Sequence, residues 1–261
     1  MTYETITVEV TDHIATITLN RPERLNACSL EMADEINSAI SDDLGDARAL
    51  LITGQGRAFC SGADLTSSGS RKVTGGRSSY YALMNHYNPL IMNIARLNLP
   101  VIASVNGPAA GVGCSLALVA DFVLASQSAY FLQAFVNIGL VPDGGSSWML
   151  PRLVGKARAT QMMMLGEKIS GAQAADWGLI YKCVEDDALQ AEARALAVRL
   201  AAGPTLAYAT MRKNILVALE NSFAEQLLAE AEGQRIAGGS ADAIEGGMSF
   251  LQKRKPEFKG K

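Results

Sequence analysis

Histidine, cysteine and charge are all scarce in this sequence. It has two histidines and four cysteines among 261 residues, and no Cys-X-X-Cys pair. Both a disulfide framework and a structural zinc site are therefore disfavoured, and a reducing, cytoplasmic compartment fits best. The net charge is −3, so the chain has no basic field that would hold nucleic acid or an anionic membrane surface.

The sequence motifs of common cofactors are missing as well. There is no Gly-X-Gly-X-X-Gly in a dinucleotide-binding context, no P-loop, no His-Glu-X-X-His and no Gly-X-Ser-X-Gly. Dinucleotide redox chemistry, P-loop hydrolysis and zinc hydrolysis therefore lack their usual support. We expect neither a metal nor a resident cofactor.

One long stretch of the chain is almost without charge. Residues 97–142 contain a single charged residue, Asp121. The stretch is long enough to cross a membrane, but its prolines and glycines interrupt any continuous apolar helix. The amino-terminal residues also have neither the basic nor the apolar part of a secretory signal. We expect the uncharged stretch to form the interior of a soluble protein.

Strands and helices alternate through the first two thirds of the chain. Alternating β-branched residues predict a hairpin, and short apolar runs predict buried strands, over 5–10, 14–20, 47–53, 101–105 and 121–125. Helices are predicted between them, after an N-cap at Ser29 and over 87–97, 111–119 and 146–153. This alternation is typical of an α/β fold with ββα repeats and a mostly parallel sheet.

The last third of the chain has a different pattern, which is almost wholly helical. Helices are predicted over 187–201, 204–219, 222–237 and 240–253, with glycine-containing breaks between them. The chain therefore divides into a core of residues 1–185 and a C-terminal helical subdomain of residues 186–261. Within the core, the small polar residues 66–79 predict a surface loop.

Two glycine-rich loops follow predicted strands. The first covers residues 54–65, and the second covers residues 106–113 and leads into a helix of small residues. Glycines let backbone approach a ligand closely, and the free N–H groups of a helix start, which we expect near Ala63, favour an anion. Each loop taken alone is equally explained by a tight turn or by close packing of a helix on the sheet.

A third loop, residues 142–145, contains an isolated carboxylate. Asp143 is the first charged residue after Asp121. A carboxylate that faces an apolar cavity has a raised pKa and can shuttle protons. The simpler alternatives are a turn aspartate and the N-cap of the following helix.

Together, in this order, these loops resemble the crotonase (enoyl-CoA hydratase/isomerase) superfamily. The resemblance covers essentially the whole chain and rests on residues 20–27 (NRPERLNA), 56–65 (GRAFCSGADL), 105–113 (VNGPAAGVG), 138–145 (IGLVPDGG), 150–155 (LPRLVG), 174–179 (AADWGL) and 250–258 (FLQKRKPEF). It implies a crotonase-like spiral of ββα repeats, with the helical subdomain packing homotrimers that often pair into hexamers.

The resemblance also implies a site for an acyl-CoA thioester, in which coenzyme A is part of the substrate. Its enolate oxygen would be bound by the backbone N–H groups of Ala63 and Val112. The coenzyme A nucleotide would lie over Arg24, Leu25, Ala27, Ser61, Asp64 and Leu65. Arg24 and the tail residues Lys259 or Lys261 are candidates to meet phosphates, with plain surface charges as the alternative.

The departures from the family pattern bear on the reaction. Hydratases of the family use two glutamates, and Ser115 and Phe135 stand at the matching positions. Asp143 instead matches the single carboxylate of the branch that contains the Δ3,Δ2-enoyl-CoA isomerases and the 1,2-epoxyphenylacetyl-CoA isomerases of phenylacetate catabolism. This similarity implies a 1,3-proton shift, with Asp143 as acid and base.

Three alternatives stay open. Enoyl-CoA hydration is disfavoured by Ser115 and Phe135. An acyl-CoA hydrolase or dehalogenase would use Asp143 as a nucleophile and would need a base, for which His86 is the candidate. A non-catalytic relative that binds acyl-CoA or RNA is disfavoured by the presence of Asp143 and by the acidic net charge.

Overall fold

The molecule is built on a six-stranded sheet, seen in a computed structural model that describes residues 2–65 and 75–261. In spatial order the strands are β1 (Ile6–Thr11), β2 (Ile14–Leu19), β3 (Ala49–Gly54), β4 (Val101–Val105), β6 (Phe122–Ser126) and β9 (Lys182–Val184). Only the β1–β2 hairpin is antiparallel, whereas the other neighbours pair in parallel. The predicted hairpin and mostly parallel sheet are therefore confirmed.

A second, three-stranded sheet joins β5 (Ala109–Ala110), β7 (Tyr130–Leu132) and β8 (Lys168–Ser170). β5 and β7 follow β4 and β6 directly in the chain, and each pair leads into a helix, so the ββα repeat is present. This is the α/β architecture with ββα repeats that the sequence predicts, with a helical carboxyl-terminal part.

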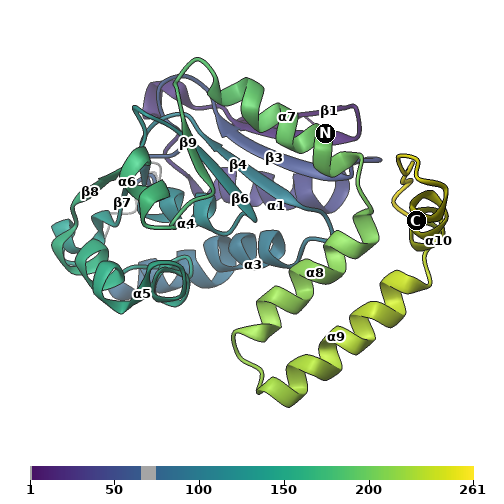
Figure 1. Ribbon diagram of the computed structural model, residues 1–261. Coiled ribbons are helices and arrows are strands. Elements are labelled where there is room, and N and C mark those ends of the chain that lie inside the picture. Colours follow the sequence, from purple (N-terminus) through teal and green to yellow (C-terminus); the bar gives the residue numbers. More distant parts are fainter. Residues whose placement is uncertain (1, 66–74) are drawn as a thin grey trace.

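The two faces of the main sheet carry separate hydrophobic cores. On β3, Leu50 and Ile52 belong to the larger core, which includes residues of α1 (Leu30–Asp42) and α3 (Asn88–Arg96). Ala49 and Leu51 belong to a smaller core with α7 (Leu189–Ala201). Alternate side chains of a strand point to opposite faces, so α1 and α7 cover opposite faces of the sheet (Figure 1).

Several predicted boundaries need correction. α2 (Gly76–Ala82) begins inside the predicted loop 66–79, of which residues 66–74 lie outside the described residues. A π-helical turn, Leu83–Tyr87, joins α2 to α3. The helix predicted over 146–153 is present as the first part of α5 (Ser146–Leu165), but a second helical part, which the sequence did not predict, follows a kink at Gly155, whose φ is 75°. Glycine tolerates this positive φ, which the sequence pattern did not reveal. The short helices are α4 (Val112–Leu118), α6 (Gly171–Asp176), η1 (Pro22–Arg24) and η3 (Ala134–Ile138).

The carboxyl-terminal helices extend away from the sheet. α8 (Thr205–Ala218) and α9 (Phe223–Gly238) form an antiparallel pair, followed by α10 (Ala241–Gln252) (Figure 1). Large apolar side chains are exposed along these helices: Ile215, Phe223, Leu228, Ile244, Phe250 and Leu251. The predicted division at residues 185 and 186 into two domains stays a prediction. Among the described residues, no helix has the length and apolar character needed to span a membrane.

One arginine anchors α8 to the core. Arg212 is 8% exposed, and its Nε lies 2.6 Å from Oδ2 of Asp121. Its guanidinium also donates to the carbonyls of Ile94 and Leu97 at the end of α3. Asp121 in turn accepts from the N–H of Val101 at the start of β4. This single network therefore fixes the position of α8 relative to α3 and β4.

Replacing Arg212 should destabilise the protein strongly. Arg212→Ala leaves a partly buried carboxylate without its cationic partner and removes a donor from two carbonyls, so the free energy of unfolding should fall by roughly 2–4 kcal/mol. The matched control is Arg235→Ala, because Arg235 pairs with Glu232 at the surface and such pairs contribute less than about 1 kcal/mol. Urea denaturation measures the free energy of unfolding of both variants, and an equal loss in the two would contradict the anchoring role of Arg212.

Candidate functional site

The two glycine-rich loops lie against each other through their backbones. The N–H of Cys60 donates to the carbonyl of Pro108, and the N–H of Ala110 donates to the carbonyl of Cys60. A Cβ built on Gly113 would stand 2.3 Å from that same Cys60 carbonyl oxygen, so no larger residue fits there. The glycine at position 113 therefore permits a direct backbone contact between the loops.

Ala63 and Val112, the two predicted oxyanion donors, follow residues that touch across this contact. A Cβ on Gly111 would lie 3.7 Å from the Cα of Gly62. Gly111 has φ 52° and ψ −127°, a conformation suited to glycine, and Val112 is the first residue of α4. Among the described residues, neither the Ala63 N–H nor the Val112 N–H donates to a backbone acceptor. Both groups are therefore available to an anionic oxygen.

No helix begins at Ala63 or at the next two residues, the last ones described before residue 75, so the helix start predicted at Ala63 was wrong there. Ala63 instead forms an isolated parallel bridge with Cys28, in which the N–H of Cys28 donates to Gly62 and the N–H of Asp64 donates to Cys28. In such a bridge the N–H of Ala63 points away from its partner strand. The N–H of Ala63 is therefore available because the backbone is extended at this residue, not because a helix starts there.

The residues predicted to meet coenzyme A come from two segments that touch. Ser61 donates from its N–H to the carbonyl of Leu25 and from its hydroxyl to the carbonyl of Arg24. Ala27 follows in the same turn and donates to Arg24. Leu65 is exposed on the other segment. The structure therefore places all of them around one surface, although their contact with coenzyme A stays a prediction.

Arg21 and Asn26, in the segment of residues 20–27, have structural roles that the sequence did not assign. Arg21 lies 2.8 Å from the carboxylate of Asp64 and donates to the carbonyl of Ala27. Asn26 is fully buried and its amide donates to the carbonyls of Gln55 and Ala58. The carboxylate of Asp64 thus ties the loops together. The NRPERLNA motif of residues 20–27 contains both residues, so it was the signal in the sequence that could have indicated these roles.

The carboxyl-terminal tail lies far from Arg24 within one chain. Asp242 accepts from the N–H groups of Lys259 and Gly260, and Arg48 donates to the carbonyl of Phe258. Arg48 precedes β3, whereas Arg24 follows the end of β2, which runs parallel to β3. The tail therefore lies at the end of the strands opposite to that of Arg24. Within a single chain, Lys259 and Lys261 therefore do not lie beside Arg24, and their contact with phosphates stays a prediction.

Asp143 lies in a tight loop packed against α4. Gly144 and Gly145 both have positive φ, and a Cβ on Gly144 would stand 2.7 Å from the Cβ of Ser115 and 3.7 Å from Cγ2 of Val112. The loop that carries Asp143 therefore touches the side chain of an oxyanion donor. The N-cap of α5 is Gly145, so Asp143 does not serve as that cap.

The side chain of Asp143 is half-buried. Its Oδ1 is buried and has no hydrogen-bond partner in the described part of the chain. Burial raises the pKa of Asp143 from 3.8 to about 6. The raised pKa expected from the sequence is thus supported, and its cause is loss of solvation without a compensating donor.

Aromatic rings lie beside these groups. Phe135, at a position where hydratases of the family have glutamate, places its ring 3.6 Å from where a Cβ on Gly111 would be. Burial, with a smaller contribution from Asp143 and other acidic groups, raises the pKa of the Tyr87 hydroxyl, which donates to the carbonyl of Cys28. The surroundings of Asp143 are therefore largely apolar. Gln133, whose side chain is also buried, is a polar residue that the sequence patterns did not single out.

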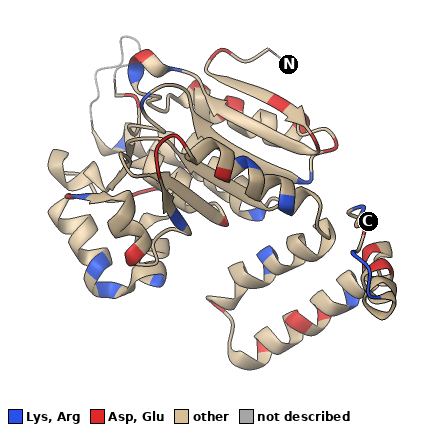
Figure 2. Ribbon diagram, turned by 45° about the horizontal axis from the view of Figure 1, so that its top comes forward, with Lys and Arg blue, Asp and Glu red and all other residues tan. Residues whose placement is uncertain are grey.

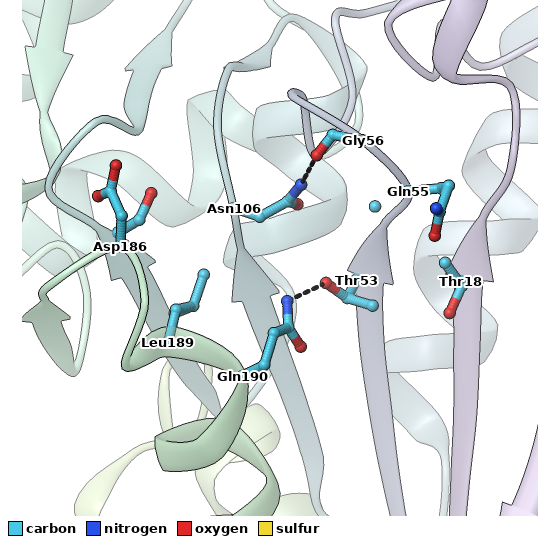
Figure 3. A pocket seen from close by; sticks show the side chains of 10 residues that line it. Thr18, Thr53, Gln55, Gly56, Asn106, Asp186, Leu189 and Gln190 are labelled. Carbon is cyan, nitrogen blue, oxygen red and sulfur yellow. Dashed lines mark hydrogen bonds between the residues drawn. The ribbon is translucent and has the colours of Figure 1, made fainter.

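A separate polar pocket of about 470 Å³ opens on the other face of the sheet (Figure 3). Gln190 of α7 donates to the hydroxyl of Thr53, and Asn106 donates to the carbonyl of Gly56. Thr53 lies two residues beyond Leu51 on the strand, so it faces the α7 core. Cys60 and Val112 belong to the larger core. This pocket is therefore distinct from the site around Ala63, Val112 and Asp143.

Removing the charge of Asp143 should stabilise the protein in a pH-dependent way. Because the pKa rises from 3.8 to about 6 on folding, the folded state holds a proton that the unfolded state has lost within this window. Stability therefore falls as the pH rises from about 4 to 6. Asp143→Asn should raise the free energy of unfolding by about 2–3 kcal/mol at pH 7.5 and by much less at pH 4.

Urea denaturation at both pH values tests this expectation. Asp46→Asn is the control, because the Asp46 side chain is 73% exposed and its replacement should change stability by less than about 0.5 kcal/mol. If Asp143→Asn were no more stable than the wild type at pH 7.5, the carboxylate would have to be solvated.

Comparisons with known proteins show the family to which this chain belongs. Residues 9–261 match the family described as enoyl-CoA hydratase/isomerase. The chain is 46% identical to the "Probable enoyl-CoA hydratase" of Rhodobacter capsulatus over 100% of both chains. It is 42% identical to the 1,2-epoxyphenylacetyl-CoA isomerase of Escherichia coli, over 99% of both chains.

A solved structure gives the same result at the level of the fold. The crystal structure of enoyl-CoA hydratase from Bacillus anthracis superposes with a TM-score of 0.92 at 29% identity, and the match covers 99% of this chain and 100% of that one. The resemblance inferred from the sequence motifs is therefore confirmed. This chain belongs to the enoyl-CoA hydratase/isomerase family of the crotonase superfamily, whose members act on acyl-CoA thioesters.

Proposed function

We propose that this protein is an acyl-CoA isomerase that moves a double bond by a 1,3-proton shift. The observation that carries the proposal is the half-buried carboxylate of Asp143, whose buried Oδ1 has no hydrogen-bond partner among the described residues and whose pKa is raised to about 6. It lies on a loop that touches Val112. Ser115 and Phe135 stand where hydratases of the family have glutamates, and neither side chain can replace a carboxylate as acid or base at neutral pH.

A single carboxylate suffices for the reaction. Starting from a Δ3-enoyl-CoA, ionised Asp143 takes a proton from the carbon next to the thioester carbonyl, and the C–H electron pair enters a dienolate. The N–H groups of Ala63 and Val112 donate to its oxygen. Protonated Asp143 then returns the proton to the γ carbon, which leaves the double bond at Δ2 and the carboxylate ionised again. A pKa of about 6 suits both steps near neutral pH.

The acyl group is proposed from the resemblance and the similar proteins. The 42% identity to a 1,2-epoxyphenylacetyl-CoA isomerase supports isomerisation of a ring epoxide to an oxepin, as in phenylacetate catabolism, beside simple enoyl-CoA substrates. Coenzyme A enters only as part of the thioester, with no further cofactor or metal.

The proposed assembly is a homotrimer or hexamer in the cytoplasm. The exposed apolar side chains of α8, α9 and α10, such as Phe223, Leu228 and Phe250, support association through these helices. Lysine and arginine are spread over several separate elements (Figure 2), which supports a small-molecule partner rather than nucleic acid.

The decisive experiment compares the wild type with Asp143→Asn in deuterated water. Trans-3-enoyl-CoA and trans-2-enoyl-CoA are offered side by side, and products are followed by chromatography and mass spectrometry. The wild type should isomerise the substrates and place solvent deuterium at the α or γ carbon. Asp143→Asn should lose at least about 10³-fold in kcat, a typical loss when a general acid–base group is removed, whereas Asp46→Asn should retain full activity. Hydration of the 2-enoyl substrate that survives in Asp143→Asn would contradict the proposal.

A hydrolytic function is the second candidate, and one contact favours it. Nδ1 of His86 lies 2.7 Å from Oδ1 of Asp34, an arrangement that can orient an imidazole as a general base. In that case Asp143 would attack as a nucleophile and His86 would activate water. His86→Ala should leave isomerisation unchanged under our proposal, whereas loss of thioester or halide release in that variant would support the hydrolase or dehalogenase.

A further inference from the structure

Ser115 belongs to a buried hydroxyl network centred on the main chain of Asp143. Its Oγ lies 3.0 Å from the carbonyl oxygen of Asp143 and 2.8 Å from Oγ of Ser146. Both serines are fully buried. The N–H of Ser146 donates to the same carbonyl at 3.1 Å, so the Asp143 carbonyl accepts two hydrogen bonds.

The direction of the hydrogen bonds follows from their chemistry. A carbonyl oxygen can only accept, so the single O–H of Ser115 must donate to Asp143. The Oγ of Ser115 is then free to accept, and the hydroxyl of Ser146 donates to it. This chain of donors fixes the rotation of the peptide after Asp143.

The network forms hydrogen bonds with the main chain of Asp143 but not with its carboxylate. No described donor reaches Oδ1. A donor to the ionised carboxylate would stabilise the charged form and make it a weaker base. Fixing the residue through its carbonyl orients the carboxylate without that loss of basicity.

Ser115 also joins this loop to the oxyanion donor. It lies on α4, three residues after Val112, so the two side chains are neighbours on one face of the helix. A Cβ on Gly144 would stand 2.8 Å from Oγ of Ser115 and 3.7 Å from Cγ2 of Val112. The distance between the base and the oxyanion donor is therefore determined largely at Ser115.

We propose that Ser115 is a positioning residue, which sets the carboxylate of Asp143 relative to the backbone N–H of Val112 through its hydrogen bond to the Asp143 carbonyl. The inference rests on the proposed function, because it assigns Ser115 a role in the proton shift carried out by Asp143. Ser115 itself touches neither substrate nor the transferred proton.

The test measures kcat and KM for trans-3-enoyl-CoA in Ser115→Ala. Loss of the hydroxyl frees the Asp143 peptide, and a displacement of about 1 Å at a reacting group costs up to about 10²-fold. We expect kcat to fall roughly 10–100-fold. KM should stay within about twofold, because the segments around Arg24 and Ser61 make no hydrogen bond to this network among the described residues.

Ser104→Ala is the matched control. Ser104 is also fully buried, and its Oγ has no hydrogen-bond partner in the described residues. It lies on β4 outside the site. This variant should keep the wild-type kcat, so it separates a specific effect from the general cost of deleting a buried hydroxyl. If Ser115→Ala does not fold, Ser146→Ala decides, since loss of the donor that orients Ser115 should lower kcat by about 3–10-fold.

Asp143→Asn is measured in the same series to separate two kinds of failure. If Asp143→Asn is inactive while Ser115→Ala keeps the wild-type kcat, or changes KM alone, the positioning role is wrong and the proposed function stands. If Asp143→Asn remains active, the proposed function itself fails and the role of Ser115 fails with it. A kcat loss in Ser115→Ala with unchanged KM and an inactive Asp143→Asn supports both.

Discussion

The site depends on one backbone contact, between the segment around Cys60 and the segment Ala109–Ala110. These two segments come from different ββα repeats, yet they exchange main-chain hydrogen bonds across an isolated bridge. A Cβ on Gly107 would stand 2.2 Å from the carbonyl oxygen of Arg57, and one on Gly113 would stand 2.3 Å from that of Cys60. Neither position can carry a side chain without separating the segments. Because Ala63 and Val112, the proposed oxyanion donors, lie just beyond this contact, the relative position of their N–H groups is set by main-chain geometry, which changes little with side-chain motion.

The carboxylate of Asp143 imposes an opposite requirement. An oxyanion site is stabilised by donors, whereas a base near neutral pH must lack them, and here the two requirements are met a few residues apart. The desolvation that raises the pKa of Asp143 is unfavourable for folding. The compensation comes from the surroundings: α5 packs Met149 and Leu150 into the larger core, and the Asp143 carbonyl is fully hydrogen-bonded. The loop is thus stabilised through its main chain and the helix that follows, while Oδ1 of Asp143, the proposed base, has no hydrogen bond among the described residues.

The sequence predicted the elements of the core well because its signals there are local. Alternating β-branched residues predicted β1 and β2, and Ser29 does cap α1, with its hydroxyl accepting from the N–H of Met32. The start of α2 at Gly76 and the part of α5 beyond the kink at Gly155 were missed, because both begin at glycines, which give little local signal for a helix. The free N–H of Ala63 was predicted from the resemblance, but the helix invoked to explain it was wrong.

The parts of the site that could not be predicted arise from pairs of residues far apart in the sequence. The Arg21–Asp64 ion pair and the Ser115–Asp143 hydrogen bond each join different loops, and a single sequence gives no signal for such pairing. Ser115 was therefore interpreted only as a missing glutamate. The attachment of the tail to Asp242 and Arg48 was missed for the same reason.

The replacement of two glutamates by one aspartate has a steric basis in this fold. Gly144 lies so close to Ser115 that even a single added carbon on its backbone would overlap the serine side chain. A glutamate at position 115 would have to enter the volume that the loop of Asp143 occupies. Phe135 likewise fills the space beside Gly111. The loop that carries Asp143 and a glutamate on α4 would therefore compete for the same volume, and under the proposed function a chain that places its carboxylate on the loop needs a small residue on the helix. Serine meets this need and also supplies the hydroxyl that holds the loop in place.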